Sequence, residues 1–259
     1  MRIATRIAAF ARDTLTLPAA PTGSQSRSDM ATGIVTVVLG AAIAAFLFLG
    51  NPYFRPFEAY ILTNCVVLFW APCVVIMGFL RQTPGDFGFV AGDRRIGWTW
   101  TVVAYAIMLP LLIAAAHMPS FSAYYLTRLM QPLAMVGSVY HPMFHPRFGA
   151  VALIYYESVM GCYLFCWEFF FRGFLLFGLA RFRRIGTWGA IVLQAVPFTL
   201  LHWSLVSYAS KPPAEIASAF VGGILLGVLA MRTRTFYYGF LIHWSIAATL
   251  DVLLLAGTR

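Results

Sequence analysis

Seven long apolar runs, each close to the length that spans a bilayer, constrain this chain more than any other feature. They cover residues 31–50, 59–80, 97–117, 150–180, 187–207, 214–231 and 236–256. A helix needs about 20 apolar residues to cross the hydrocarbon core. The runs lack the alternation of a strand, and a helix satisfies its own backbone groups in lipid. The sequence therefore predicts an all-α fold, a polytopic transmembrane helical bundle of about seven spans.

The composition agrees with a membrane location. Hydrophobic residues make up 61% of the 259 residues and charged residues only 10%, whereas a soluble domain has about 25% charged residues. The formal charge of +9 is also found in proteins that bind nucleic acid. Here, however, the arginines lie between the apolar runs and form no basic patch, so they are interpreted as residues that orient the chain in the bilayer. The predicted partner is lipid, and no nucleic acid is expected.

The chain divides into three predicted parts. Residues 1–29 are expected to form a flexible cytoplasmic arm, because Arg2, Arg6 and Arg12 interrupt any signal-peptide core. Residues 30–149 are expected to form scaffold helices with a long loop at 118–149, and residues 150–259 a core of four helices. The fourth run has 31 residues, or about 45 Å of helix, so it must tilt, kink near Gly161 or project from the membrane.

The distribution of positive charge predicts an orientation. With a cytoplasmic N-terminus, twelve cationic residues fall on the inner side and five on the outer side, as the positive-inside rule expects. The Arg-rich, Lys-poor composition points to a bacterium, so the expected location is the cell inner membrane, with several passes. The inner residues are Arg2, Arg6, Arg12, Arg27, Arg81, Arg94, Arg95, Arg181, Arg183, Arg184, Arg232 and Arg234, and the outer ones are Arg55, Arg128, Arg147, Lys211 and Arg259.

Ionisable residues inside the apolar runs need an explanation, because each is costly in lipid. Glu168 and Arg172 are four residues apart, so on a helix they share a face and can neutralise one another. Glu157 lies about three turns earlier on that face and is interpreted as a surface group that extends toward the interface. Asp251 lies near the end of the final run.

Two histidines complete the candidate site. His202 ends the run Pro197-Phe198-Thr199-Leu200-Leu201-His202, and Phe198, one turn earlier, can fix the rotamer of its ring. His243 lies early in the last span. Either histidine alone is more often a hydrogen-bonded core residue. Together with Glu168 they form a set that is competent for general acid–base hydrolysis or for holding zinc.

Other candidate ligands carry less information. The four cysteines lie inside apolar segments, where a disulfide scaffold is not expected. Two histidines in the long loop are interpreted as solvated polar surface, with metal binding as the alternative. These residues are Cys65, Cys73, Cys162, Cys166, His141 and His145.

The order of these motifs resembles a known family. Glu-x-x-x-Arg, then Phe-x-x-x-His, then a histidine in the last span is similar to the CPBP family of intramembrane proteases, also called the Abi or type II CAAX protease family. The resemblance covers about residues 150–255, with a weaker similarity upstream at Asp86-Phe87-Gly88-Phe89 before Arg94 and Arg95.

The resemblance assigns positions residue by residue. Glu168 and Arg172 match the second Glu and the Arg of the first family motif, Glu-Glu-x-x-x-Arg, whereas its first Glu, usually assigned to water activation, is Trp167 here. Phe198 and His202 match the second motif in full. His243 matches the third motif, His-x-x-x-Asn, but its Asn position is Ala247. Two positions that are usually polar are therefore apolar.

The resemblance implies an intramembrane endopeptidase without a cofactor. In this hypothesis Glu168 activates water with His202, while His243, aided by Asp251, stabilises the oxyanion and Arg172 holds Glu168 in place. The expected substrate is a membrane-anchored or lipidated protein, and removal of a C-terminal anchor is one form of this reaction.

Four alternatives remain open at this stage. Loss of catalysis would leave a silent CPBP-like protein that acts as a binding or immunity partner. A zinc mechanism, with the metal held by Glu168, His202 and His243, is the second alternative. A thiol mechanism at Cys166 is the third alternative. A transporter is disfavoured because the chain has no two similar halves.

Overall fold

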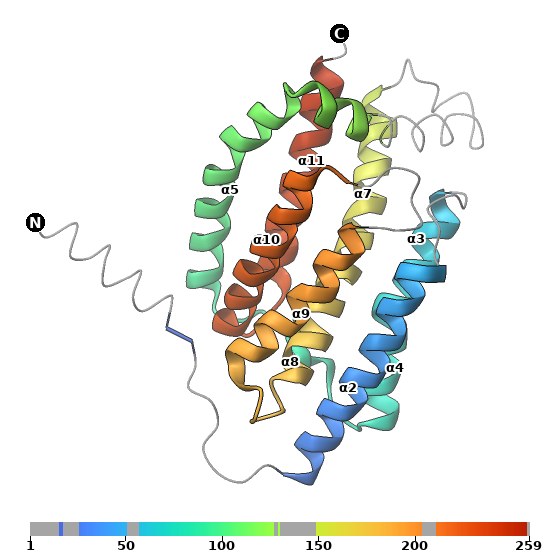
Figure 1. Ribbon diagram of the computed structural model, residues 1–259, viewed down its shortest axis with the longest axis vertical. Helices are drawn as coiled ribbons and strands as arrows, with labels where there is room; N and C mark the ends of the chain where they lie inside the picture. Colours follow the sequence, from blue (N-terminus) through green and yellow to red (C-terminus); the bar gives the residue numbers. More distant parts are fainter. Residues whose placement is uncertain are drawn as a thin grey trace, which may run out of the picture.

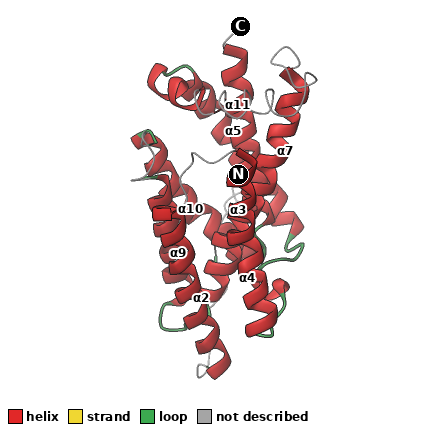
Figure 2. Ribbon diagram, turned by 90° about the vertical axis from the view of Figure 1, so that its right-hand side faces the viewer, coloured by secondary structure: helices red, strands yellow, loops and turns green. Residues whose placement is uncertain are grey.

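The computed structural model describes residues 16–17, 26–50, 57–126, 129, 149–203 and 211–257. Every regular element in these residues is helical, as Figure 2 shows, which confirms the predicted all-α class. Six helices there are long and apolar enough to cross a membrane. Figure 1 shows a bundle whose long helices run alternately up and down. His141, His145 and most of the predicted 1–29 arm lie outside the described residues.

The first helices form the outer part of the bundle. The helix α2 begins inside the predicted arm, where the hydroxyl oxygen of Ser26 accepts a hydrogen bond from the backbone N–H of Asp29 at 3.0 Å. Asp93 caps α5 in the same way through Ile96. The elements are α2 (Arg27–Ala45), η1 (Phe46–Gly50), α3 (Phe57–Cys65), η2 (Val66–Trp70), α4 (Ala71–Val74), η3 (Val75–Phe79), η4 (Pro84–Phe87) and α5 (Arg94–Ala116).

The fourth span is the central helix of the molecule. It consists of α7 (Gly149–Glu168), the π-helical η7 (Phe169–Leu175) and α8 (Leu176–Leu179). In an 18-residue apolar stretch of this span, 78% is buried inside the protein, against 6% in the corresponding stretch of α5. The departure from α-helical geometry lies in η7 and not near Gly161. All the residues of η7 are buried, so η7 lies at the centre of the bundle.

The last three helices pack around this central span. They are α9 (Gly186–His202), α10 (Pro213–Thr233) and α11 (Tyr237–Gly257). The sequence predicted a span over 187–207, but α9 has 17 residues and ends at His202, since Trp203 leaves helical geometry with φ −97° and ψ 46°. Figure 1 shows that α9 stops partway along the bundle. His202 therefore lies at mid-depth and not near the outer surface.

Three small residues of α10, Ala219, Gly223 and Gly227, are spaced four residues apart and are all buried, and the two glycines face α9. A Cβ added to Gly223 would lie 3.0 Å from the Cβ of Ala195, and one added to Gly227 would lie 2.9 Å from Nε2 of Gln194. The Gln194 amide also donates a hydrogen bond to the carbonyl oxygen of Gly223 at 2.8 Å. Close approach through glycine lets a polar group join two membrane helices.

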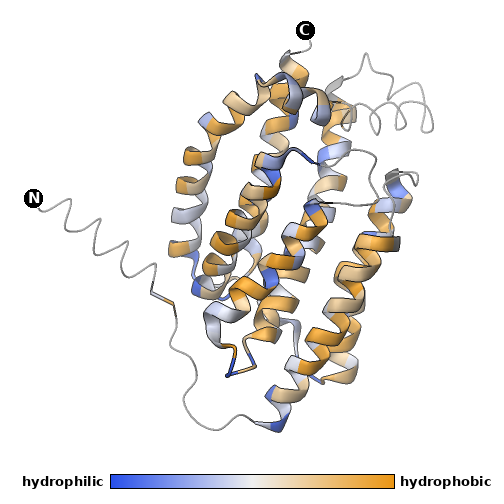
Figure 3. Ribbon diagram, in the orientation of Figure 1, coloured by the Kyte–Doolittle hydropathy of each residue, from blue (hydrophilic) through white to orange (hydrophobic). Residues whose placement is uncertain are grey.

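Arginines collect at one end of the bundle. In Figure 1 the starts of α2, α5, α9 and α11 and the ends of η3, α8 and α10 are the lower ends of these elements. Figure 3 shows hydrophilic residues at this end and mostly hydrophobic residues along the helices. The arginines at these helix ends are Arg27, Arg81, Arg94, Arg95, Arg181, Arg183, Arg184, Arg232 and Arg234. The alternation of the helices thus places the predicted inner residues of the described segments on one side.

A short turn beside this end carries an acidic residue outside the spans. In η4 the Asp86 carboxylate accepts hydrogen bonds from the backbone N–H of Thr83 at 2.9 Å and from its hydroxyl at 2.8 Å. These bonds hold the pKa of Asp86 below its usual range, the backbone bond having the larger effect. The turn then leads to α5, where the backbone N–H of Asp93 donates to the carbonyl oxygen of Thr233 at 2.9 Å.

Candidate active site

Glu168 lies where α7 meets η7, in the most buried part of the molecule. Its side chain and that of Arg172 are both 0% exposed. Nη1 of Arg172 donates to Oε1 of Glu168 at 3.0 Å, which confirms the pairing predicted from their spacing. A buried carboxylate without such a partner would be expensive in lipid. The pair therefore brings two opposite charges into the bundle centre.

Arg172 makes a second contact, with an aromatic ring. Its guanidinium carbon lies 3.9 Å from the centroid of the Phe198 ring on α9. At a desolvated site such a cation–π contact contributes about 2 kcal/mol. The Nε and Nη2 groups of Arg172 have no hydrogen-bond partner among the described residues. Phe198 thus supports Arg172 as well as the histidine one turn further along α9.

His202 has a defined ring orientation. Its Nδ1 lies 2.8 Å from the carbonyl oxygen of Phe198, and the two rings have centroids 4.7 Å apart. A carbonyl oxygen only accepts hydrogen bonds, so Nδ1 carries the proton, and Nε2 of the neutral ring keeps its lone pair. Phe198 fixes the histidine as the sequence suggested, through its backbone as well as its ring.

His243 contacts the same carboxylate oxygen as Arg172. Its Nδ1 lies 2.7 Å from Oε1 of Glu168, and its side chain is 23% exposed. An ionised carboxylate only accepts, so Nδ1 of His243 donates and Nε2 is left with its lone pair. The Phe198 ring lies 6.2 Å from the His243 ring. The three predicted catalytic residues Glu168, His202 and His243 therefore meet around Phe198, from the ends of α7 and α9 and the second turn of α11.

Gly239 was not anticipated by sequence reasoning. A Cβ added to it would lie 3.2 Å from Oε2 of Glu168. Gly239 precedes His243 by four residues, so both lie on the face of α11 that meets Glu168. The four-residue spacing of Gly239 and His243 can be read from the sequence. It indicates a role for Gly239 only when Glu168 is known to lie against this face of α11.

Trp167 fills space beside the site. Its ring makes an edge contact with the His202 ring, with centroids 6.3 Å apart, and another with Phe198 at 6.0 Å. The side chain is buried, and its Nε1–H has no hydrogen-bond partner among the described residues. An indole therefore occupies the position where the family motif has its first Glu.

Asp251 does not join this group. Its carboxyl group interacts with that of Glu157 on α7 and not with His243, two turns earlier on α11. The interpretation of Glu157 as a surface group is also wrong, because both of its carboxyl oxygens are buried. The indole N–H of Trp244 donates to the backbone carbonyl oxygen of Glu157 at 3.1 Å. The expected help of Asp251 to the oxyanion therefore has no support in its placement.

The proposed zinc ligands do not form a metal cluster. Among the described residues, no three His, Cys, Asp or Glu side chains lie close enough together to hold a metal ion. The three-ligand set of Glu168, His202 and His243 therefore does not fit zinc in this arrangement. Cys166, two residues before Glu168, is a buried free thiol.

The fold and this site define a polytopic helical membrane protein with a buried Glu–Arg–His–His group. Residues 149–249 match the sequence model of the Rce1-like type II CAAX prenyl endopeptidase family. The match confirms the resemblance to the CPBP/CAAX proteases over the segment that runs from the start of α7 into α11. Searches among curated proteins and among solved structures found no match.

Proposed function

We propose that this protein is an intramembrane endopeptidase in which His243, oriented by Glu168, activates water to cleave a membrane-anchored or lipidated protein. The observation that carries the proposal is the 2.7 Å contact between Nδ1 of His243 and Oε1 of Glu168. A carboxylate that holds one ring nitrogen of a histidine directs the other toward the reacting groups.

The burial of the two residues assigns their roles. Glu168 has no exposed side-chain surface, whereas 23% of the His243 side chain is exposed. The exposed part of His243 therefore supports its role as the group that meets water and the peptide. This differs from the hypothesis drawn from the sequence, in which Glu168 itself takes the proton from water. Here Glu168 stabilises the imidazolium that forms on His243.

His202 and Arg172 have supporting roles. Since the Nδ1 proton of His202 is held by the carbonyl oxygen of Phe198, its Nε2 is free to accept a hydrogen bond from the attacking water. Arg172 offsets the negative charge of Glu168, and its field lowers the energy of the oxyanion. The ring of Phe198 contacts both Arg172 and His202 and holds them in fixed positions relative to each other.

The reaction is hydrolysis of a peptide bond. The oxygen of water bonds to the carbonyl carbon while its proton moves to Nε2 of His243. The tetrahedral intermediate then collapses, the C–N bond breaks, and His243 returns the proton to the departing nitrogen. The products are a carboxylic acid and an amine, and no residue of the protein is modified.

The experiment measures cleavage by purified protein in liposomes. C-terminally anchored proteins and peptides with a prenylated C-terminus serve as substrates. His243→Gln and His202→Gln should each lower the cleavage rate by about 100-fold or more, the range for loss of acid–base catalysis. The matched control is His117→Gln, because His117 is exposed at the end of α5, away from the site. Wild-type cleavage rates in both site variants would overturn the proposal.

A catalytically silent partner protein is the second candidate. The observation in its favour is that Glu168 and Arg172 are fully buried while Trp167 fills the position of the usual water-activating Glu. This candidate predicts that wild type cleaves no anchored substrate and that His243→Gln still supports binding to the partner. A cleavage product that appears with wild type and is absent with His243→Gln would exclude it.

We propose that the arginine-rich end of the bundle faces the cytoplasm of a bacterial cell, in its inner membrane. The support is the collection of helix-end arginines on one side, which the positive-inside rule assigns to the cytoplasm. Cysteine labelling in intact cells tests this orientation. A cysteine placed at exposed Arg95 should react with a membrane-impermeant reagent only after the cells are opened.

A further inference from the structure

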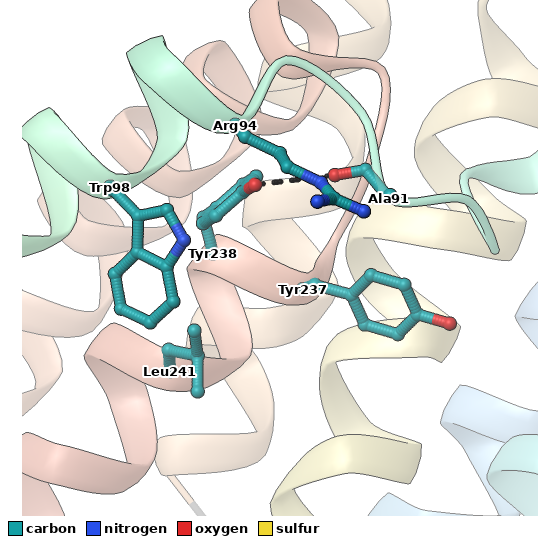
Figure 4. Close-up of a pocket in the computed structure, with 6 residues that line it drawn as sticks. All are labelled: Ala91, Arg94, Trp98, Tyr237, Tyr238 and Leu241. Carbon is teal, nitrogen blue, oxygen red and sulfur yellow. Dashed lines mark hydrogen bonds between the residues drawn. The ribbon is translucent and has the colours of Figure 1, made fainter.

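A pocket lies away from the candidate active site, at the arginine-rich end. It occupies about 340 Å³ between the start of α5 and the first turns of α11. Figure 4 shows its lining side chains, with the Arg94 guanidinium near the carbonyl oxygen of Ala91 and with Trp98 and Leu241 further from that carbonyl. The lining residues are Ala91, Arg94, Trp98, Tyr237, Tyr238 and Leu241. One side of the pocket is thus cationic and the rest is aromatic or aliphatic.

Arg94 provides an available positive charge. Its side chain is exposed, and no carboxylate among the described residues forms an ion pair with it. The neighbouring Asp93 carboxylate accepts a hydrogen bond from the backbone N–H of Ile96 at 3.0 Å, because it caps α5. The Tyr238 hydroxyl donates to the Ala91 carbonyl oxygen at 3.3 Å. A planar guanidinium with free N–H groups favours a phosphate as its ligand.

The rest of the pocket is suited to hydrocarbon. Trp98 lies one turn after Arg94 on α5, is 55% exposed and makes an edge contact with Tyr238, with ring centroids 6.1 Å apart. Leu241 lies one turn after Tyr238 on α11. Only 6% of the 18-residue apolar stretch of α5 is buried inside the protein, so lipid chains cover the surface next to the pocket. Tryptophan and tyrosine beside an arginine at the end of a span are typical of the membrane interface.

We propose that this pocket binds an anionic phospholipid, with its phosphate on Arg94 and an acyl chain along Trp98 and Leu241. A free phosphate would make no contact with the apolar part of the pocket, and a neutral hydrocarbon would leave the charge of Arg94 unpaired. The arginines at this end also raise the local concentration of anionic lipid. The inference does not depend on the protein being a protease.

The pocket and the candidate active site use opposite sides of the same helix. Tyr238 and Leu241 line the pocket, whereas Gly239 and His243 meet Glu168. A lipid bound here therefore supports the turns of α11 that carry His243. It is a ligand of the α5–α11 interface and does not enter the Glu168 site.

The test compares lipid binding by full-length purified variants. Protein in neutral detergent is titrated with phosphatidylglycerol or with phosphatidylcholine, and bound lipid is counted by native mass spectrometry. Arg94→Gln should lower the affinity for phosphatidylglycerol by about tenfold, while binding of phosphatidylcholine stays weak and unchanged. The matched control is Arg95→Gln, which removes the same charge from the next residue but does not line the pocket.

A second pair of variants tests the apolar part. Trp98→Ala should weaken phosphatidylglycerol binding about tenfold, as expected for loss of the contact between the indole ring and the acyl chain. Trp188→Ala should leave it unchanged, because Trp188 is similarly exposed at 58% but lies on α9. Thermal unfolding checks that all four variants are folded. An equal loss with Arg94→Gln and Arg95→Gln would mean diffuse attraction and overturn the proposal. Displacement of the lipid by equimolar inorganic phosphate would overturn it too, because the ligand would then be phosphate alone.

Discussion

Two acidic regions lie on the same pair of helices and differ in how their charge is balanced. At the junction of α7 and η7, Glu168 contacts both Arg172 and His243. About three turns earlier on α7, Glu157 faces Asp251 of α11. Neither Glu157 nor Asp251 has an ion pair with a cation among the described residues. The same helix interface therefore contains a carboxylate that contacts an arginine and a histidine, and a pair of carboxyl groups that contact neither.

The difference shows which acid is arranged for chemistry. Two adjacent carboxylates inside a bilayer repel one another and lose their hydration, so the neutral carboxylic acid form removes most of the cost. At Glu168, by contrast, Arg172 compensates the charge of the carboxylate and His243 donates a hydrogen bond to it. A carboxylate that stays ionised can orient a histidine, whereas a carboxylic acid pair chiefly joins two helices. We therefore place the reaction at Glu168 and not at Glu157.

The largest expected effect comes from removing the compensating charge. Arg172→Met should lower the free energy of unfolding by about 3–5 kcal/mol, because it leaves Glu168 as an unpaired charge at the centre of the bundle. Reversible denaturation in mixed micelles measures this loss.

The double variant Glu168→Gln/Arg172→Met is the control for that experiment. It should recover a large part of the lost stability, since no unpaired charge remains. If the double variant is as unstable as Arg172→Met, the loss reflects packing of the Arg172 side chain against Phe198 and not charge compensation.

A smaller effect is expected from the acidic pair. Glu157→Gln/Asp251→Asn should change the free energy of unfolding by less than about 1 kcal/mol, because amides keep the shape and remove the repulsion. Cleavage, where it is measured, should also be retained. A loss of activity comparable to that of His243→Gln would contradict the comparison and place Glu157 or Asp251 in the reaction.

Helix positions were predictable because a span needs a nearly continuous apolar run. The predicted run at 97–117 corresponds to α5 (Arg94–Ala116), and that at 236–256 corresponds to α11 (Tyr237–Gly257). The end of α9 at His202 was not predictable, since the sequence stays apolar through Val206. Hydrophobicity predicts where a helix is stable in lipid and gives no information on where the chain turns inside the bundle.

Side-chain partners were predictable only within one helix. The four-residue spacing of Glu168 and Arg172 fixes their contact, because both lie on one face. Contacts between helices depend on rotation and relative height, which one sequence does not determine. Hence the contact between Glu168 and His243 was not predicted, because the hypothesis paired Glu168 with His202. Asp251 was likewise assigned to His243 when it faces Glu157. The family motif supplied the grouping of the residues that periodicity alone could not.

The smallest expected effect is at Asp86, an acidic residue outside the membrane. It serves as a hydrated reference for the two acidic regions inside the bundle. Hydrogen bonds from Thr83 lower the pKa of Asp86 in the folded protein. Its carboxylate therefore contributes stability above the unfolded pKa, about 3.9 for Asp. That contribution is lost as the pH falls through the lower pKa of the folded state. Asp86→Asn should flatten the dependence of stability on pH in this acidic window. It should lower stability at neutral pH only slightly, because Asp86 is exposed. Denaturation midpoints measured from neutral to acidic pH test this. An equal loss at every pH, including values at which Asp86 is protonated, would contradict this prediction, because the turn would then need the Asp86 side chain itself and not its charge.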